Sequence, residues 1–170
     1  LSVFYFPYNQ ETKNDAGRIR LYPLLEITYG KTKKEVQKNL KKLDFLGQSL
    51  LFNIKNGAYD AFQKVIFKLK KLIQKKPDLK KYLLPAAGTF SYRKIAGTNR
   101  YSAHSFGIAV DLNVKYSDYW RWHKDWEKQT YSYPPEIVEI FESEGFIWGG
   151  RWKHFDTMHF EYRPEFQKRD

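Results

Sequence analysis

The ten residues Ser102-Ala-His-Ser-Phe-Gly-Ile-Ala-Val-Asp111 decide how the rest of the chain is interpreted. They place an imidazole, His104, seven residues before a carboxylate, Asp111. From Gly107 to Val114, small and apolar side chains alternate around Asp111, which predicts a buried strand that carries one carboxylate. Because an unpaired buried carboxylate is costly, Asp111 is expected to face a cation or strong hydrogen-bond donors.

A second histidine lies in a similar setting near the end of the chain. His159 stands between Met158 and Phe160, in a run that has the composition of a strand. Zinc accepts imidazole and carboxylate ligands, and three protein ligands with an open fourth position are typical of catalytic zinc sites. We therefore take His104, Asp111 and His159 as candidate metal ligands, with a satisfied core histidine as the alternative for each imidazole. The H-E-x-x-H signature of helical zinc peptidases is absent.

The composition indicates a globular protein with an excess of positive charge. The chain has 170 residues, enough to bury a core, and 18% of them are aromatic. Thirty Lys and Arg against nineteen Asp and Glu give a net charge of +11, which favours an anionic partner such as nucleic acid, anionic lipid or an acidic wall polymer. The lysine runs are expected to lie mainly on solvated helix faces.

Cysteine and long apolar runs are both absent from the sequence. The lack of Cys excludes a disulfide framework and thiolate catalysis. The lack of an apolar run long enough to span a membrane predicts a soluble chain. Because the chain starts at Leu1 rather than Met, a signal segment or anchor upstream is left open.

The first half of the chain is expected to be mainly helical. Residues 1–29 are broken by Pro and Gly and predict irregular or short extended structure. Thr32 and Glu35 form a capping box, which predicts a helix that continues to Gly47. The apolar periodicity over residues 58–76 predicts a second and clearer helix.

The second half is expected to supply most of the strands. Residues 89–92 have strand composition, and Pro134 opens a third predicted helix that stops at Gly145. Residues 146–148 and 158–162 then predict two paired strands. Helices early and strands late indicate the α+β class.

We expect a single domain over residues 1–170. It is divided into a mainly helical portion, 1–88, and a core, 89–163, that holds the candidate ligands on a small antiparallel sheet with helices packed on one side.

Two further side chains are candidates for catalysis. Asp156 stands three residues before His159, where a carboxylate beside a metal site can accept a proton from water and deliver it to a leaving amine. A turn or strand-end aspartate is the alternative. Arg93 can stabilise the oxyanion of a tetrahedral intermediate, although an arginine at a strand end is more often simply exposed. Ser102 is expected to orient its neighbours by hydrogen bonding.

Four blocks of sequence, in this order, resemble a known family. They are Tyr92-Arg93, the S-x-H-x-x-G-x-A-x-D pattern from Ser102 to Asp111, the Gly145-Phe-Ile-Trp-Gly-Gly150 block with Trp152, and Asp156-x-x-His159-Phe-Glu161. Together they resemble the M15 zinc peptidases of bacterial cell walls, which include D-alanyl-D-alanine carboxypeptidases and L-alanyl-D-glutamate endopeptidases. The chain is most similar to the branch that contains phage endolysins. The resemblance covers residues 89–162 and leaves the role of the first half open.

The resemblance implies a site and an activity. It implies Zn²⁺ held by His104, Asp111 and His159, with Asp156 as general base and Arg93 as a clamp on the carbonyl or transition state. Since the carboxypeptidase branch carries Glu in place of Asp156, the resemblance favours an endopeptidase. It also implies that the protein cuts peptidoglycan stem peptides. We further expect a monomer that is exported to the periplasm or cell wall, where its positive charge favours association with anionic wall polymer.

The sequence also allows other functions, and it contains further residues that could contribute to a site. A non-catalytic module of the same fold, bound to wall polymer through its lysines, is the main alternative. Nucleic-acid binding is disfavoured because the sequence has no glycine-rich phosphate loop, zinc-finger spacing or RNP-type run. His123 and His154 are expected to be exposed. Five aromatic residues either wall a peptide groove or pack in the core: Tyr116, Tyr119, Trp120, Trp148 and Trp152.

Overall fold

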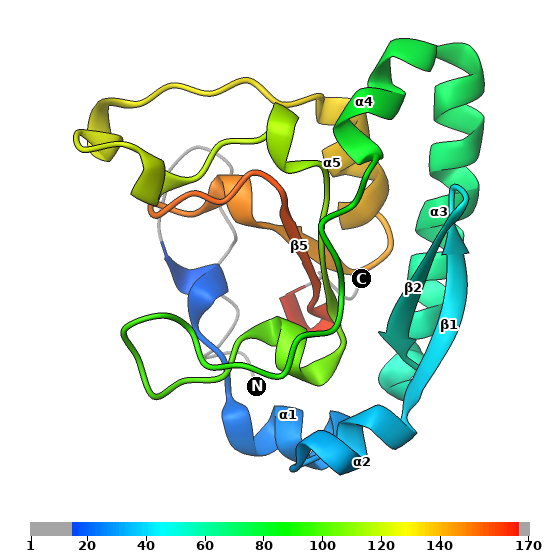
Figure 1. Ribbon diagram of the computed structural model, residues 1–170, viewed down its shortest axis with the longest axis vertical. Helices are drawn as coiled ribbons and strands as arrows, with labels where there is room; N and C mark the ends of the chain where they lie inside the picture. Colours follow the sequence, from blue (N-terminus) through cyan, green and yellow to red (C-terminus); the bar gives the residue numbers. More distant parts are fainter. Residues whose placement is uncertain (1–14, 167–170) are drawn as a thin grey trace.

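The structure is a computed structural model that describes residues 15–166 (Figure 1). Its helices and strands, in chain order, are α1 (Tyr22–Tyr29), α2 (Lys33–Lys38), β1 (Leu40–Phe45), β2 (Gln48–Asn53), α3 (Ala58–Lys75), α4 (Lys80–Leu83), β3 (Ala109–Asp111), α5 (Pro135–Glu142), β4 (Phe146–Trp148) and β5 (His159–Tyr162). Expectations for residues 1–14 lie outside the described part of the chain. Within the described part, every helix is too short or too polar to cross a membrane.

β5 is the central strand of a three-stranded antiparallel sheet, with β3 on one side and β4 on the other. The register between β3 and β5 pairs Asp111 with His159. Because side chains alternate between the two faces of a strand, His159 shares a face with Glu161, whereas Phe160 points to the opposite face. The sheet therefore places two candidate ligands side by side on one face.

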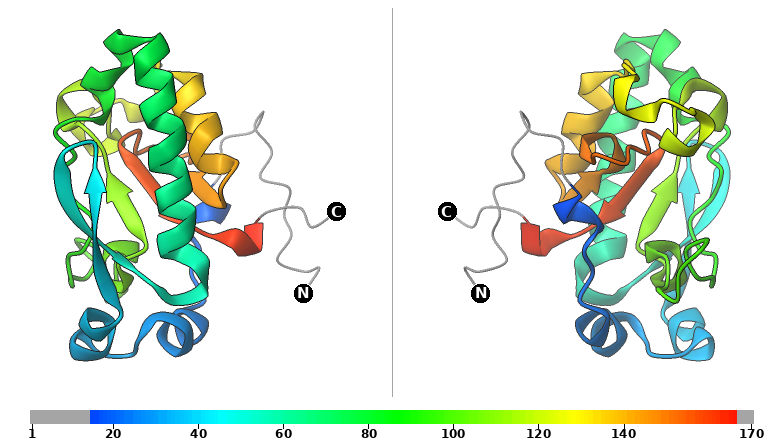
Figure 2. Two further views of the ribbon diagram at one scale, coloured as in Figure 1. Left: turned by 90° about the vertical axis from the view of Figure 1, so that its right-hand side faces the viewer. Right: turned by 90° about the vertical axis from the view of Figure 1, so that its left-hand side faces the viewer.

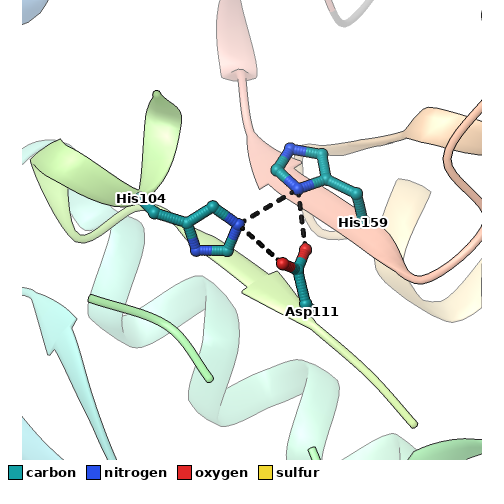
Figure 3. Close-up of side chains that lie close together, drawn as sticks. All are labelled: His104, Asp111 and His159. Carbon is teal, nitrogen blue, oxygen red and sulfur yellow. Dashed lines mark hydrogen bonds and ion pairs between the residues drawn. The ribbon is translucent and has the colours of Figure 1, made fainter. Parts of the chain in front are cut away.

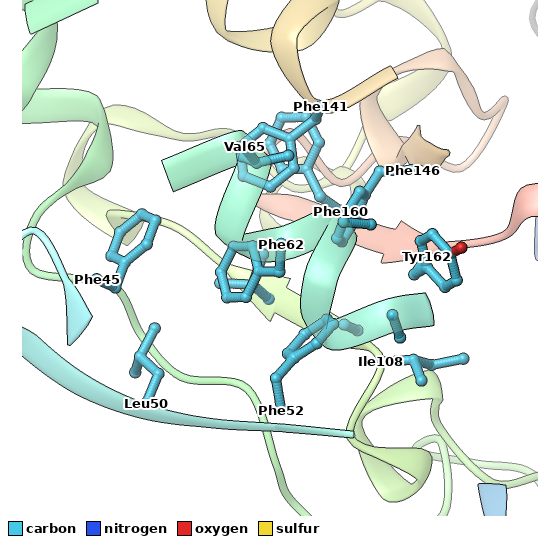
Figure 4. Packing of buried hydrophobic residues seen from close by; sticks show 14 of the residues in the cluster. Phe45, Leu50, Phe52, Phe62, Val65, Ile108, Phe141, Phe146, Phe160 and Tyr162 are labelled. Atoms are coloured by element: carbon cyan, nitrogen blue, oxygen red, sulfur yellow. The ribbon is translucent and has the colours of Figure 1, made fainter. Parts of the chain in front are cut away.

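α3 and α5 cover the other face of this sheet (Figure 2). Phe160 stacks on Phe141 of α5 with ring centroids 4.1 Å apart, and Phe62 of α3 lies 5.9 Å from Phe146 of β4 (Figure 4). Burying a side chain of this size contributes roughly 1.5–3 kcal/mol, so the aromatic layer anchors the strands that carry the site. The predicted α+β fold, a small antiparallel sheet with helices on one side, is confirmed.

Several predicted elements are confirmed with shifted ends. The helix predicted over 58–76 is α3, and the helix predicted from Pro134 is α5. The predicted strands at 146–148 and 158–162 are β4 and β5, which pair as expected. The strand predicted from Gly107 to Val114 is the shorter β3.

The helix predicted from Thr32 to Gly47 is wrong beyond its first turns. The capping box is present, since Thr32 accepts a hydrogen bond from the Glu35 amide at 3.2 Å and Glu35 accepts one from the Thr32 amide at 3.2 Å. The helix ends after Lys38, and the following residues form β1, which pairs with β2 in a hairpin. Leu43 and Phe45 are buried while their neighbours are exposed, so an alternating pattern overrides the helical spacing.

Two other local predictions are also wrong. Residues 22–29 form α1 rather than irregular structure; Pro23 lies in its first turn, where the missing amide hydrogen costs nothing. Residues 89–92 form no strand, and this part of the chain makes only the isolated bridges Gly88–Asp111 and Lys94–Tyr101. Because β1 and β2 lie in the first half of the chain, strands are also not confined to the second half.

Candidate metal centre and active site

The three candidate ligands converge on one point (Figure 3). His104 Nε2 lies 3.3 Å from His159 Nδ1 and 3.1 Å from Asp111 Oδ2, and Asp111 Oδ1 lies 2.9 Å from His159 Nδ1. Two ligand atoms bound to one tetrahedral zinc ion at its usual bond lengths lie about 3.4 Å apart. His104, Asp111 and His159 thus form a group that can hold a metal ion.

Local structure fixes the position of His104. It lies in a 3₁₀ turn, Ala103–Phe106, whose first amides are capped by Ser102, because Ser102 Oγ accepts a hydrogen bond from the His104 amide at 3.3 Å. The turn ends at Gly107, which has a positive φ of 66° and leaves no room for a side chain, since a Cβ there would lie 2.4 Å from Leu40. The close approach lets the Gly107 carbonyl accept a bond from the Asn53 amide at 2.9 Å.

The remaining ring nitrogen of each histidine is held by an acceptor. His104 Nδ1 lies 2.7 Å from the Thr89 carbonyl oxygen, and His159 Nε2 lies 2.8 Å from Glu161 Oε2. A carbonyl or carboxylate oxygen only accepts, so these two nitrogens carry the protons. His104 Nε2 and His159 Nδ1 are left facing the metal position, as the outer contacts of metal-binding histidines require.

Glu161 is the centre of a buried ion network beneath His159. Its side chain has no exposed surface, and it pairs with Arg163 at 2.8 Å and with Arg20. Burial acts to raise the pKa of Glu161, but Arg20, the hydrogen bond from His159 and Arg163 together hold this pKa well below its usual value. Glu161 is therefore an anion that fixes the orientation of the His159 ring.

Asp156 lines the same pocket as the ligands. Its amide donates to the Gly149 carbonyl at 3.0 Å, and the approach is so close that a Cβ on Gly149 would lie 2.5 Å from the Asp156 carbonyl oxygen. Asp156 Oδ1 is buried and has no hydrogen-bond partner among the described residues. Burial raises the pKa of Asp156 to about 6, with His159 opposing and Asp111 reinforcing the rise. The carboxylate is thus free to accept a proton.

Arg93 also lines this pocket, from an extended segment without regular structure. Its backbone is tied to the His104 turn, because Ser105 Oγ donates to the Arg93 carbonyl at 2.8 Å and accepts from the Arg93 amide at 3.0 Å. Its guanidinium has no carboxylate partner within the described residues. The full lining contains the three ligands, Asp156, Arg93, Ser102, Arg18, Arg20, Ile95, Tyr119 and Trp152.

Residues 96–162 match the family model described as D-alanyl-D-alanine carboxypeptidase. This match supports the assignment of residues 96–162 to the M15 peptidases. The peptidoglycan L-alanyl-D-glutamate endopeptidase CwlK of Bacillus subtilis (strain 168) is 37% identical to the chain over 67 residues, which are 37% of the chain and 40% of the relative. The chain thus spans less than half the length of that curated relative. No solved structure matches the chain significantly.

The M15 match includes four of the predicted site residues, His104, Asp111, Asp156 and His159. It begins three residues after Arg93 and therefore leaves out this arginine, as well as everything contributed by the N-terminal segment. The structure nevertheless brings these outer residues to the same pocket.

Sequence reasoning missed Arg18 and Arg20, which both line this pocket. Arg18 lies over the Trp152 ring at 5.1 Å and donates to the His154 carbonyl at 2.8 Å. Gly17 allows this approach, since a Cβ there would lie 2.4 Å from Trp152 Nε1. No local motif marks this segment, because the side-chain contacts that place Arg18 in the pocket are made with residues more than 130 positions away in the sequence.

The missed role of Glu161 did have a signal in the sequence. It stands two residues after His159 in a predicted strand, and side chains two apart share a face. An acidic side chain in that position is a natural acceptor for the second ring nitrogen of a metal-binding histidine.

His123 and His154 are not exposed as expected. His123 Nε2 lies 2.5 Å from Asp118 Oδ1, and His154 Nδ1 lies 2.5 Å from Asp15 Oδ2. Their side chains are 28% and 33% exposed, so each is half-buried against a carboxylate.

The five aromatic residues have different places in the structure. Tyr119 and Trp152 line the metal pocket, and Trp120 lines a groove beside it. Trp148 stacks on Phe160 at the edge of the core with centroids 6.4 Å apart. Tyr116 is exposed and contacts Tyr82 at 5.5 Å, so it neither walls the pocket nor packs in the core.

Proposed function

We propose that the chain is a zinc-dependent peptidase that hydrolyses an amide bond in the stem peptides of bacterial peptidoglycan. One observation carries the proposal: three candidate ligands converge within bonding reach of one ion, and Asp156, whose buried Oδ1 has no hydrogen-bond partner among the described residues, lines the same pocket. The M15 match and the peptidoglycan endopeptidase relative support the choice of substrate.

The donor set supports zinc as the metal. Two imidazole nitrogens and one carboxylate oxygen are a three-ligand set of the kind found in catalytic zinc sites. The outer contacts from His104 to Thr89 and from His159 to Glu161 fix both rings in the tautomers that ligation needs. When bound, zinc lowers the pKa of water and polarises a carbonyl oxygen.

Asp156 and Arg93 have separate roles in the reaction. Asp156 accepts a proton from the attacking water as the water oxygen bonds to the carbonyl carbon, and it delivers a proton to the nitrogen as the C–N bond breaks. Arg93 donates hydrogen bonds to the carbonyl oxygen, on which negative charge develops. The Asp156 pKa of about 6 in the metal-free protein leaves this carboxylate largely ionised at neutral pH, ready to act as a base.

Within this class we favour cleavage between L-alanine and D-glutamate. The relative carries that activity in its name, and Asp rather than Glu at position 156 agrees with the endopeptidase branch. A D-alanyl-D-alanine carboxypeptidase is the second candidate, since this is the description of the matching family model.

The basic surface fits a substrate embedded in an anionic wall. Lys71, Lys75 and Lys80 are exposed near the end of α3 and the start of α4, and they have no carboxylate partner among the described residues. Long-range attraction to wall carboxylates and phosphates would concentrate the protein at its substrate. We accordingly propose a monomer exported to the periplasm or cell wall.

Digestion of purified peptidoglycan tests this function. We expect the zinc-loaded protein to release peptides that begin with D-glutamate, identified by mass spectrometry, and the Asp156→Ala protein to release few or none. Release of free D-alanine would identify the carboxypeptidase instead. Intact stem peptides after prolonged digestion by zinc-loaded protein would contradict both activities.

A further inference from the structure

We propose that a groove beside the metal pocket binds a free carboxylate on the substrate residue that follows the cleaved bond. Arg18, Arg100 and Arg121 would bind this carboxylate. The inference rests on the proposed peptidase function and deepens it, because it assigns the feature of the stem peptide that the protein recognises.

The groove adjoins the metal pocket. Arg18 and Ile95 line both cavities, so Arg18 stands at their junction. The groove has a cavity volume of about 350 Å³, whereas the metal pocket has about 90 Å³. The metal pocket therefore has room for the reacting amide alone, and the groove has room for a neighbouring part of the peptide.

The arginines of the groove have no salt-bridge partner in the part of the chain that the structure describes. Arg18, Arg100 and Arg121 line the groove, and none of them forms an ion pair within the described residues. Asp15 is the carboxylate of this lining, and both of its oxygens are taken by His154, through Nδ1 at 2.5 Å and the amide at 3.1 Å. Asp15 still acts on the charge of Arg18, so an anion entering the groove would meet three arginines against one carboxylate of the lining.

Three other arginines of the described chain behave differently. Arg20 and Arg163 pair with the buried Glu161, and Arg151 pairs with Glu142. Those three arginines hold the fold together, because each is paired with a carboxylate of the protein. The contrast marks the groove arginines as groups available to a ligand.

Two of the groove arginines are held in place before any ligand arrives. The guanidinium of Arg18 lies over the Trp152 ring at 5.1 Å, and that of Arg121 lies over the Trp120 ring at 5.0 Å. Arg121 also donates to the Ala96 carbonyl at 3.3 Å. Each guanidinium has five N–H donors, so further donors are left for an anion. Positioned donors lose less conformational entropy when they bind.

The chemistry of the substrate supplies a matching anion. D-glutamate has two carboxyl groups, and only one of them continues a peptide chain. Its other carboxylate lies within one residue of a bond cut on its amino side. Arg18 is placed to meet such a group because it borders the metal pocket as well as the groove. A planar carboxylate also matches the forked donors of arginine.

A pair of stem peptides separates recognition from hydrolysis. One peptide carries the free carboxylate on D-glutamate, and the other carries the same group as an amide. We expect the zinc-loaded wild-type protein to favour the free acid in kcat/KM by about 10- to 100-fold, as charge-assisted hydrogen bonds predict. In the Arg18→Gln and Arg121→Gln proteins this ratio should fall towards one.

Controls show that such a loss is specific. Lys64→Gln removes the same charge from an exposed position on α3 outside both cavities, and it should keep the wild-type ratio. Zinc content and thermal unfolding of each variant show whether the metal site and fold are intact. Arg121 is exposed, so its variant is informative even if Arg18→Gln fails to fold.

Two outcomes would overturn the inference while leaving the peptidase intact. One is a wild-type protein that cuts the acid and the amide equally well, and the other is a pair of arginine variants that keep the wild-type ratio. Calorimetric binding of both peptides tests the groove without hydrolysis. Preferential binding of the acid that depends on Arg121 would uphold the groove even if neither peptide is cut, whereas equal affinities would refute it.

Discussion

His159 Nε2 lies 2.8 Å from Oε2 of Glu161, the residue two positions further along the same strand. The contact links the candidate metal site to a buried ion network, because Glu161 is also paired with Arg163 and Arg20. The strand therefore supplies both a candidate metal ligand and the group that orients it.

Replacing Glu161 with Gln should weaken zinc binding and the fold together. Loss of an outer contact to a metal-binding histidine lowers affinity by about 10- to 100-fold. Leaving the buried guanidinium of Arg20 without its anion costs about 3–5 kcal/mol of unfolding free energy, whereas Arg163 keeps its ion pair with Glu165. Competition with a chelator measures the first effect, and denaturant unfolding measures the second. The exposed Glu139→Gln is the matched control, and unchanged zinc affinity in Glu161→Gln would contradict the assigned role.

Asp156→Ala should retain zinc and lose turnover. Asp156 is not among the three converging ligands, and a positioned general base contributes about 10²- to 10⁴-fold to the rate. We expect one zinc per chain by elemental analysis, with kcat lowered at least about a hundredfold. Loss of the metal in this variant would instead show that Asp156 is a ligand.

Zinc affinity should rise with pH. In the metal-free protein burial acts to lower the pKa of His159, but hydrogen bonds to Asp111 and Glu161 outweigh it and raise this pKa to about 10. His159 is therefore protonated below that pH, and it must lose its proton to bind a metal. Between pH 6 and 8 the apparent zinc affinity should increase about tenfold per pH unit. Titrations at three pH values measure the slope, and a flat profile would exclude proton release.

Gly149→Ala should disturb the base without touching a ligand. The added Cβ would lie 2.5 Å from the backbone oxygen of Asp156, which cannot move as a flexible side chain would. Overpacking of this kind costs roughly 1–3 kcal/mol, and displacement of Asp156 should reduce kcat while zinc content stays constant. Thermal unfolding and steady-state kinetics test both parts. A variant with wild-type kcat would show that this contact does not position Asp156.

The parts of the molecule that could be predicted are those with local signals. The apolar stripe of α3 and the capping box at Thr32 depend on residues that are three or four positions apart in the sequence. The spacing from His104 to Asp111 and the strand pattern around His159 are likewise local, and the register between β3 and β5 then joins them.

Other parts depend on contacts that no local pattern encodes. Leu40 and Leu43 have helical spacing from Val36, yet Leu43 and Phe45 are buried on one face of the β1–β2 hairpin, where Phe45 stacks on Phe62 of α3. Arg18 lies in a segment without a motif, and its place is set by Trp152 and His154. Contacts between residues so far apart in the sequence determine which side chains line the pocket, and no local sequence pattern predicts them.

Titration of zinc into protein from which a chelator has removed the metal tests whether His104, Asp111 and His159 form a working metal centre. With hydrolysis of a defined stem peptide as the readout, activity should be absent at first, rise in proportion to added zinc and level off at one ion per chain. The His159→Ala protein should stay inactive throughout. Full activity in the chelated protein, or hydrolysis by His159→Ala at the wild-type rate, would contradict the proposed metal centre.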